Sequence, residues 1–437
     1  MKVLKINEKS LLKKKNYGKI HLVIQMNFND IQKLKDSLKI DVNKANEKQL
    51  KVLKNKAKRL KDTRIKKKCT YKLWDIVCVV ILAVLSNCNE WDEIYYFATT
   101  HKEWLKSFLK LTGGIPQPST YERVISMIDS HELNNLCVEF MIRLVEIPIN
   151  PEYDFYHIDG KVEKGSGRKN NAKNEVIKNL NVLNVYSDLL SMCIDQEMIE
   201  EKTNEITAIP DVIKRLNVKN VICTWDALNT QKNTVEAVIQ GKGDYVGALK
   251  GNQGSFYQDV IDYFDEDKLM IIQSGYEGAY KEELEKSHSQ VIKYEYYQTE
   301  DIKWYEDVKS WKGLKSIGLV VKTMENKKGE KVVEKRYYIS SLLIDIYNFS
   351  KAIRNHWNVE NKLHWQLDFT FKSDDNTTVN KKALFNLQII KKFALNILNQ
   401  VKDDYKCSLK KIRFQISLNA PEELERIFKL MDKRLEN

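Results

Sequence analysis

Three acidic residues stand where a metal-dependent phosphoryl-transfer site could be built. Asp159 ends the alternating segment YDFYHIDG and Asp226 ends NVICTWDA, each directly before a small residue. In open α/β sheets the ligand site lies at the carboxyl ends of the strands, so two acids at that edge are candidates for one cluster. Acids also end strands because turns are polar, so neither aspartate identifies a site by itself.

The third acid, Glu360, lies in a segment with helical periodicity. One stripe at three-and-four spacing contains Ile353, Trp357, Glu360, His364 and Leu367. We therefore expect Glu360 to face the core, where a carboxylate is unfavourable unless it is paired. A cation shared with the two aspartates would pair it. A structural pair with Arg354, His356 or Lys362 is the alternative.

The ligand types favour one class of metal. Three carboxylates without a thiolate or paired-histidine set favour Mg²⁺ or Mn²⁺ over zinc. Two such ions could activate a water molecule or a DNA 3′-hydroxyl and stabilise the leaving oxygen in an in-line displacement at phosphorus. The sequence lacks the phosphate loop of nucleotide hydrolases, the nucleophile elbow of α/β-hydrolases and the zinc-protease motif His-Glu-x-x-His.

The segments around the acids predict the elements that must position them. From residue 151, strand-like and helix-like segments alternate, which predicts an α/β sheet with parallel pairs. Residues 287–344 alternate as strands without intervening helices, so we expect a mostly antiparallel insertion. Helices are predicted over about 346–367 and 381–400, and the region up to about 148 is predicted to be all-helical.

Charge is concentrated at the start of the chain. Of the 437 residues, the first 70 carry 22 Lys/Arg and 6 Asp/Glu, a net charge of +16 within a total of +12. A basic arm on a near-neutral body suits a polyanion such as DNA, because neutralising phosphates releases counterions. A Lys-rich solvated helix is the alternative.

Cysteine usage and hydropathy predict a cytoplasmic protein. Seven cysteines without a C-x-x-C pair argue against a disulfide framework or a zinc module. The longest apolar run, residues 76–85, is shorter than the roughly 18 residues that a bilayer requires. The N-terminus contains lysines but no apolar signal core.

Six motifs in order resemble a known family. They are HIDGK (157–161), EKTNEITAIPDVI (201–213), TWDALNTQK (224–232), DYVGALKGNQ (244–253), RYYISSL (336–342) and IRNHWNVENKLHWQLDFTF (353–371). Over about residues 60–400 the chain resembles bacterial insertion-sequence DDE transposases of the ISAs type. This group includes the H-repeat-associated proteins and is related to the IS-four-like DDE transposases.

The resemblance implies a fold and a domain order. It implies an RNase H-like α/β catalytic domain over residues 151–437, with a β-rich insertion at about 265–345. A helical transposase-associated domain is expected over 61–150, preceded by a basic, Lys-rich helical DNA-binding arm over 1–60. Asp159, Asp226 and Glu360 match the acidic triad of the family.

The resemblance and the basic residues near the acids also suggest DNA contacts. The expected contact residues are Lys161, Lys232, Lys250, Asn252, Gln253, Arg354 and Lys362. Several of them could instead be turn residues that organise the fold. Related transposases place an arginine and a lysine around the final glutamate where this chain has His356 and Leu367, so Arg354 and Lys362 could serve instead. Trp357 and Trp365 could stack on a distorted base, although helical tryptophans are more often core residues.

The predicted function is that of a DNA transposase with two Mg²⁺ or Mn²⁺ ions. It would cleave the ends of its own element and join the 3′-hydroxyl to target DNA. The implied partners are double-stranded DNA and a second copy of the chain on that DNA, and the implied location is the bacterial cytoplasm, at the nucleoid. An RNase H-like nuclease without strand transfer and a catalytically inactive, element-derived DNA-binding protein are the alternatives.

Overall fold

The fold was analysed in a computed structural model. It describes residues 49–145, 153–170, 175–199, 204–275, 279–287, 290–325 and 329–436. The chain forms two compact units, which are described separately. Unit 1 consists of Met1–Ile147, Glu163–Leu180 and Gln366–Asn437, and unit 2 of Pro148–Val162 and Asn181–Trp365. Residues 1–48, most of the predicted basic arm, lie outside the described residues, and the domain boundaries expected from the sequence stay a prediction.

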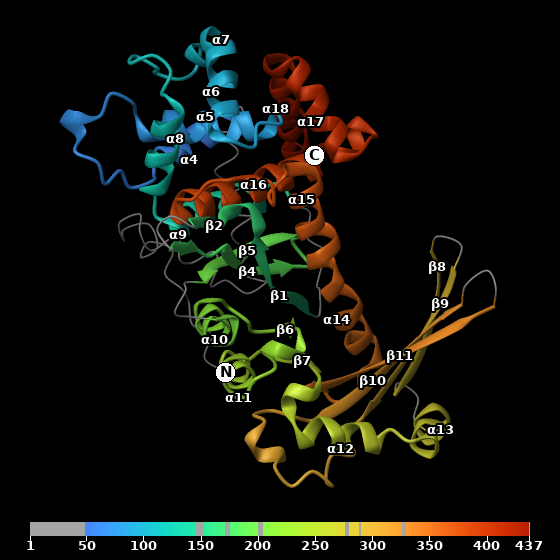
Figure 1. Ribbon diagram of the computed structural model, residues 1–437. Helices are drawn as coiled ribbons and strands as arrows, with labels where there is room; N and C mark the ends of the chain where they lie inside the picture. The colour runs from blue at the N-terminus through green and yellow to red at the C-terminus, as the bar shows by residue number, and fades with distance from the viewer. Residues whose placement is uncertain are drawn as a thin grey trace, which may run out of the picture. The chain divides into compact units, whose positions relative to one another are not determined.

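A nine-stranded mixed sheet dominates unit 2 (Figure 1). Its strands in chain order are β1 (Asp154–Glu163), β4 (Leu180–Ser187), β5 (Met192–Ile199), β6 (Val221–Trp225), β7 (Asp244–Leu249), β8 (Tyr280–Ser287), β9 (Gln290–Thr299), β10 (Ser316–Glu325) and β11 (Lys331–Ser340). In space the order is β5-β4-β1-β6-β7-β11-β10-β9-β8. The β1–β6 and β6–β7 pairs are parallel, and the pairs from β7–β11 to β9–β8 are antiparallel.

This topology confirms the predicted fold class. The core of the sheet is an RNase H-like α/β arrangement, and the antiparallel strands β8–β11 form the β-rich insertion. All five residues of β6 are buried, as expected for a central parallel strand that is covered on both faces. The insertion begins before residue 287, where the alternation in the sequence was predicted to start. Its first strand, β8, consists mostly of charged residues, so it lacks the alternation of a half-buried strand.

The helices of unit 2 lie beside these strands. They are α10 (Glu205–Arg215), α11 (Lys232–Gln240), α12 (Ser255–Tyr263), α13 (Glu266–Gly275) and α14 (Ile346–Asn358). Helix α14 packs against β6–β9, where Phe349 and Ile353 join the buried cluster around Phe155 and Tyr296. Pro210 does not break α10 and is buried within it. These packed helices fix the positions of the loops that follow the strands.

Unit 1 is mainly helical. Its helices are α4 (Gln49–Ala57), α5 (Leu73–Leu85), α6 (Trp91–Thr100), α7 (Lys102–Lys106), α8 (Pro118–Ser126), α9 (Ser130–Ile142), α16 (Lys381–Tyr405), α17 (Leu409–Leu418) and α18 (Ala420–Glu436), with α15 (Trp365–Phe371) leading into it and a short β2–β3 hairpin (Arg168–Asn170, Glu175–Ile177). Helix α16 packs against α5, α8 and α9, although these elements are far apart in the sequence (Figure 1). The predicted helical N-terminal region is therefore confirmed.

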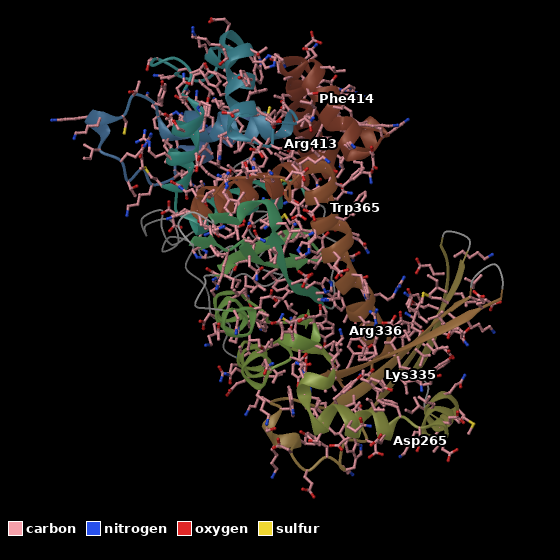
Figure 2. All side chains as sticks on the ribbon, in the orientation of Figure 1. Asp265, Lys335, Arg336, Trp365, Arg413 and Phe414 are labelled. Carbon is pink, nitrogen blue, oxygen red and sulfur yellow. The ribbon has the colours of Figure 1, made fainter. Side chains whose placement is uncertain are left out.

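A buried arginine holds two helix ends of unit 1. Arg413, labelled in Figure 2, is fully buried and donates hydrogen bonds to the carbonyl oxygens of Val84 and Thr370 and to the side chain of Asn89. Its guanidinium lies over the ring of Phe371, 4.1 Å from the centroid. Val84 and Thr370 lie in the last turns of α5 and α15, where carbonyl groups lack helical partners. A cation at these positions also interacts favourably with both helix dipoles.

The apolar helix α5 belongs to this core. Every residue from Ile76 to Leu85 is buried within unit 1. In the part of the chain that the structure describes, no helix is long and apolar enough to cross a membrane. The seven cysteines are all free thiols.

Candidate active site

The two predicted aspartates come from the neighbouring parallel strands β1 and β6. The strand register pairs His157 with Thr224, two residues before Asp159 and Asp226. Asp159 lies within β1 and Asp226 is the first residue after β6, toward the edge where α/β sheets carry their ligand sites. Asp226 also caps the short helix η3 (Ala227–Asn229), since its Oδ1 accepts a hydrogen bond from the backbone N–H of Asn229 at 3.1 Å.

The electrostatics of Asp159 identify its neighbours. Burial, together with the charges of Asp226, Glu205 and Glu360, raises the pKa of Asp159 to about 7. Surrounding protein atoms likewise raise the pKa of Asp226, and the charge of Glu205 adds to this effect. We call Asp159, Glu205, Asp226 and Glu360 the acid cluster. The negative charges of the other members oppose ionisation of Asp159.

Glu360 is exposed, so its predicted orientation was wrong. It lies in a π-helical turn, Val359–His364, between α14 and α15, and its side chain is open to solvent. Val359 and Leu363 face the core instead. The wider turn, with hydrogen bonds from i to i+5, shifts the buried stripe relative to a continuous α-helix. Glu360 nevertheless lies near Asp159, because its charge acts on the Asp159 carboxyl.

His364 lies one turn beyond Glu360 and contacts Asp159. Its Nδ1 is 3.6 Å from Oδ2 of Asp159, and its Nε2 is 3.2 Å from Nδ2 of Asn184. His364, which the sequence analysis named only as a member of the helical stripe, thus lies beside the Asp159 carboxyl.

Glu205 was missed by the sequence reasoning. It lies in the first turn of α10, half-buried, and accepts hydrogen bonds from Nδ2 of Asn229 at 3.0 Å and Nδ2 of Asn181 at 3.3 Å. Its carboxyl group occupies the space where a β-carbon on Gly160 would lie. The motif EKTNEITAIPDVI contained this residue, but an acid in a first helical turn is ordinarily explained by the helix dipole.

A buried hydrogen-bond chain links the three elements that carry the predicted triad. Oγ1 of Thr224 is 2.6 Å from Nδ1 of His157 and 2.9 Å from Nδ1 of His356. Nε2 of His157 is 3.1 Å from the Asp188 carboxylate. His157 and Thr224 each precede a cluster aspartate by two residues, and His356 precedes Glu360 by four. This chain therefore ties β1, β6 and α14 together directly beneath the acids.

Thr224 Oγ1 lies within hydrogen-bond distance of both imidazoles, and Nε2 of His157 lies against the Asp188 carboxylate. Burial, with the charge of His157, lowers the pKa of His356 to about 3, so this ring is neutral. Burial opposes ionisation of Asp188, but the hydrogen bond and charge of His157 lower its pKa overall.

Some predicted DNA-contact residues lie around the cluster. Lys161 is buried on β1, two residues beyond Asp159. Lys250 is exposed, and its charge lowers the pKa of Asp226, so the ammonium lies near the acids. Asn252 and Gln253 both donate side-chain hydrogen bonds of 2.8 Å to the Ala227 carbonyl oxygen. Their amides therefore hold the loop after Asp226, as the fold-organising alternative expected.

Three predicted DNA-contact residues remain, and two of them form ion pairs with residues outside the acid cluster. Lys232 pairs with Asp307 at 3.0 Å. Arg354 pairs with Glu285 at 2.6 Å and lies over the ring of Tyr294. Lys362 is exposed in the π-helical turn. Arg354 thus pairs with a residue of β8, and Lys232 pairs with a residue of the loop between β9 and β10.

The two tryptophans near Glu360 differ in their surroundings. The guanidinium of Arg336, labelled in Figure 2, lies 4.5 Å from the ring centroid of Trp357. Trp365, also labelled there, has 51% of its surface exposed. One face of Trp357 is therefore covered, whereas Trp365 presents a large apolar surface to solvent.

Two sequence families match the chain. The family described as "DDE_Tnp_1-associated" matches residues 55–141, and the family described as "Transposase DDE domain" matches residues 150–397. The chain belongs to the DDE transposase family. The second match spans more than half of the chain and includes the whole acid cluster, and the resemblance inferred from the six motifs is confirmed.

Two relatives of this transposase from Escherichia coli each match more than three quarters of its length. The chain is 33% identical to "Putative transposase YncI" over 362 residues, 82% of this chain and 90% of the relative. It is 32% identical to "H repeat-associated putative transposase YhhI" over 339 residues, 77% of this chain and 87% of the relative. A shorter match, 39% over 59 residues, 14% of this chain and 70% of the relative, is to "Inactive transposase YbfQ". The names describe an insertion-sequence transposase family with at least one member named as inactive.

The donor atoms of the transposase site suit a hard divalent cation. The acid cluster supplies carboxylate oxygens, and Oδ1 of Asn229, on a fully buried residue, has no hydrogen-bond partner in the structure. Mg²⁺ and Mn²⁺ bind such oxygen ligands. Within the described ranges, no three His, Cys, Asp or Glu side chains stand close enough together to hold an ion as they are. The residue types of the acid cluster therefore suit such a metal.

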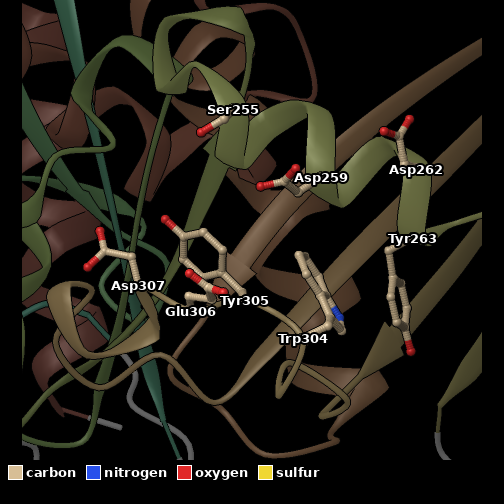
Figure 3. A pocket seen from close by; sticks show the side chains of 8 residues that line it. All are labelled: Ser255, Asp259, Asp262, Tyr263, Trp304, Tyr305, Glu306 and Asp307. Atoms are coloured by element: carbon tan, nitrogen blue, oxygen red, sulfur yellow. The ribbon is translucent and has the colours of Figure 1, made fainter.

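A surface pocket elsewhere on unit 2 does not include the acid cluster. It is lined by residues of α12 and of the loop between β9 and β10, where the rings of Tyr263 and Trp304 are stacked 5.4 Å apart (Figure 3). Its lining is rich in carboxylates, including Asp259 and Asp307. This surface would repel DNA phosphates and has no part in the candidate site.

Proposed function

We propose that this transposase catalyses metal-dependent cleavage of the ends of an insertion sequence and joins the resulting 3′-hydroxyl to target DNA. In this proposal Asp159, Asp226 and Glu360 are the catalytic carboxylates. The observation that carries it is the parallel β1–β6 register, which pairs His157 with Thr224, the residues two positions before Asp159 and Asp226. Glu360, on a solvent-open π-helical turn, acts electrostatically on the same carboxyl.

The three carboxylates would hold two Mg²⁺ or Mn²⁺ ions. When bound, these ions supply Lewis-acid stabilisation of the attacking and leaving oxygens during in-line displacement at phosphorus. The protein's contribution is to keep Asp159 and Asp226 in register through the His157–Thr224–His356 chain. His364 would steady the Asp159 carboxyl from its other side. In cleavage a water oxygen attacks phosphorus and the P–O3′ bond breaks, with the proton lost by water balanced by the one gained at the released 3′-oxygen. In joining the DNA 3′-oxygen attacks a target phosphate, one P–O bond of the target breaks, and the 3′-hydroxyl proton is likewise balanced at the released oxygen.

The predicted DNA contacts are part of the same proposal. Lys250 and Lys161 lie nearest the acids and would neutralise phosphates there, and Lys232, Arg354 and Lys362 would act farther along the DNA. For Asn252 and Gln253 the bonds to Ala227 favour a role in holding the Asp226 loop. The basic arm, residues 1–60, would add affinity for DNA of any sequence. A homodimer would bring two DNA ends together. The protein would act at the nucleoid in the cytoplasm.

The deciding experiment is a cleavage and joining assay on DNA from the two flanks of the gene's own locus. Wild-type protein should cleave and join with Mg²⁺ or Mn²⁺ and do neither with EDTA. Asp159→Asn, Asp226→Asn and Glu360→Gln should each lower the rate by about a hundred-fold or more, while gel-shift affinity for the DNA ends stays within two-fold. Asp211→Asn, an exposed acid on α10 paired only with Lys214 among the described residues, is the matched control.

The outcomes separate the alternatives. Metal-dependent cleavage without joining would favour an RNase H-like nuclease. DNA binding with neither reaction would favour an inactive, element-derived DNA-binding protein. One relative is named "Inactive transposase YbfQ". Full activity in one of the three acid variants would remove that residue from the proposed triad.

A further inference from the structure

Glu205 is held at the acid cluster by close contact with the backbone beside Asp159. A β-carbon on Gly160 would overlap Oε1 of Glu205 and come within 3.0 Å of Oε2. The Glu205 carboxyl therefore lies directly over the residue that follows Asp159, in space that only a glycine leaves open. An acid that packs on this backbone is within reach of the ligands that Asp159 binds.

Both oxygens of Glu205 are oriented by amides. Nδ2 of Asn229 donates to Oε2 at 3.0 Å, and Nδ2 of Asn181 donates to Oε1 at 3.3 Å. Asn229 also donates its backbone N–H to Asp226. One fully buried residue thus holds two carboxylates of the cluster. Each carboxylate oxygen can accept a second interaction, so these bonds leave ligand capacity on Glu205.

Two ordinary explanations for Glu205 are weak here. It is not the helix cap, because Asn204 caps α10 and forms the capping box with Thr207. Within the part of the chain that the structure describes, no lysine, arginine or histidine forms an ion pair with Glu205. It instead lies among like charges, which is unfavourable unless a cation is shared.

A separate observation points to a ligand at this place. Oδ1 atoms of Asn229 and Asn181 are buried without a hydrogen-bond partner in the structure, while the Nδ2 atoms of the same amides face Glu205. A buried polar atom without a partner is unfavourable by about 1–3 kcal/mol, unless water or an ion satisfies it. Two buried amide oxygens on the residues that bind Glu205 are therefore not satisfied by the described residues.

We propose that Glu205 is a fourth carboxylate ligand of the transposase site and binds a divalent cation together with Asp159 and Asp226. The inference rests on the proposed function, because it assumes that these aspartates hold the ion. It adds a ligand from α10, an element outside the three that carry the predicted triad. Gly160 is then required because a side chain there would displace the Glu205 carboxyl.

The test measures Mn²⁺ affinity of the full-length protein by titration calorimetry and electron paramagnetic resonance, without DNA and without turnover. Glu205→Gln, which keeps the shape but not the charge, should weaken Mn²⁺ binding by about ten-fold or more. Gly160→Ala alters no charge and should weaken binding similarly by displacing the carboxyl. In the double variant the second change should add little, because both act on the same oxygen atoms. Asp211→Asn on the same helix should bind as wild type does.

The outcomes distinguish this inference from the proposed function. If Asp159→Asn loses Mn²⁺ affinity while Glu205→Gln and Gly160→Ala bind within two-fold of wild type, Glu205 is not a ligand and the proposed triad stands. If wild type binds no Mn²⁺, or Asp159→Asn binds as wild type does, the metal site itself is wrong. Should Glu205→Gln fail to fold in a circular-dichroism melt, Gly160→Ala decides, since it requires only a side-chain shift.

Discussion

At the scale of single residues, the transposase site is a concentration of negative charge that the protein does not itself neutralise. The Asp159 carboxyl has its pKa raised to about 7 by burial and by the neighbouring carboxylates. Folding thus makes its ionisation harder than in the unfolded chain, where the pKa is near 3.8. This conflict between stability and charge is common where acids are arranged for function.

The conflict has a measurable pH dependence. As pH rises from about 4, the unfolded chain loses the Asp159 proton first, so the metal-free fold loses stability until about pH 7 and stays less stable above it. Asp159→Asn removes this penalty. In EDTA, urea denaturation should show Asp159→Asn more stable than wild type at pH 8 by on the order of 1–4 kcal/mol, and nearly equal at pH 4.5. Asp211→Asn should show no such difference, and equal gains at both pH values would contradict the assignment.

At the scale of elements, the hydrogen-bond chain through Thr224 holds β1, β6 and α14 at the spacing that the acids require. Thr224→Val keeps the shape of the side chain but leaves two imidazoles without their partner. We expect a loss of about 1–3 kcal/mol in the free energy of unfolding, and a lower rate of strand cleavage with DNA affinity unchanged. Thr224→Ser restores the hydroxyl and should recover both properties. Equal rates and melting curves for Thr224→Val and wild type would show that the chain does not position the acids.

The same elements show what the sequence could and could not predict. Asp226 follows a strand end as the alternating segment predicted, whereas β1 continues past Asp159 to Glu163 instead of ending at Gly160. The orientation of Glu360 was not predictable, because the argument assumed 3.6 residues per turn, and the π-helical turn shifts the buried stripe to Val359 and Leu363. Glu205 was missed because its site depends on contact with Gly160, far from it in the sequence.

At the scale of the whole molecule, the proposed function assigns attraction to DNA and chemistry on DNA to different parts of the chain. Residues 1–48 carry 12 lysines and 5 acidic residues and lie outside the described residues, whereas the acid cluster alone would repel phosphates. Long-range attraction therefore has to come from basic segments, with Lys250 supplying a local positive charge beside Asp226. Added salt should strongly weaken the attraction between the basic segments and DNA, because that attraction depends on counterion release.

This separation predicts the effect of neutralising the arm. Replacing Lys13, Lys14 and Lys15 by glutamine should weaken binding to any DNA duplex and flatten the dependence of log affinity on log salt, by about 0.9 for each phosphate that the arm no longer neutralises. Binding should be measured by fluorescence anisotropy from 50 to 300 mM salt, with Lys402→Gln/Lys429→Gln, two exposed lysines of α16 and α18, as the control. At saturating protein the cleavage rate should stay within about two-fold of wild type, because phosphate contacts position the DNA without entering the chemical step. An unchanged salt slope together with an abolished cleavage rate would mean instead that the arm acts at the active site, and the division between attraction and chemistry would be wrong.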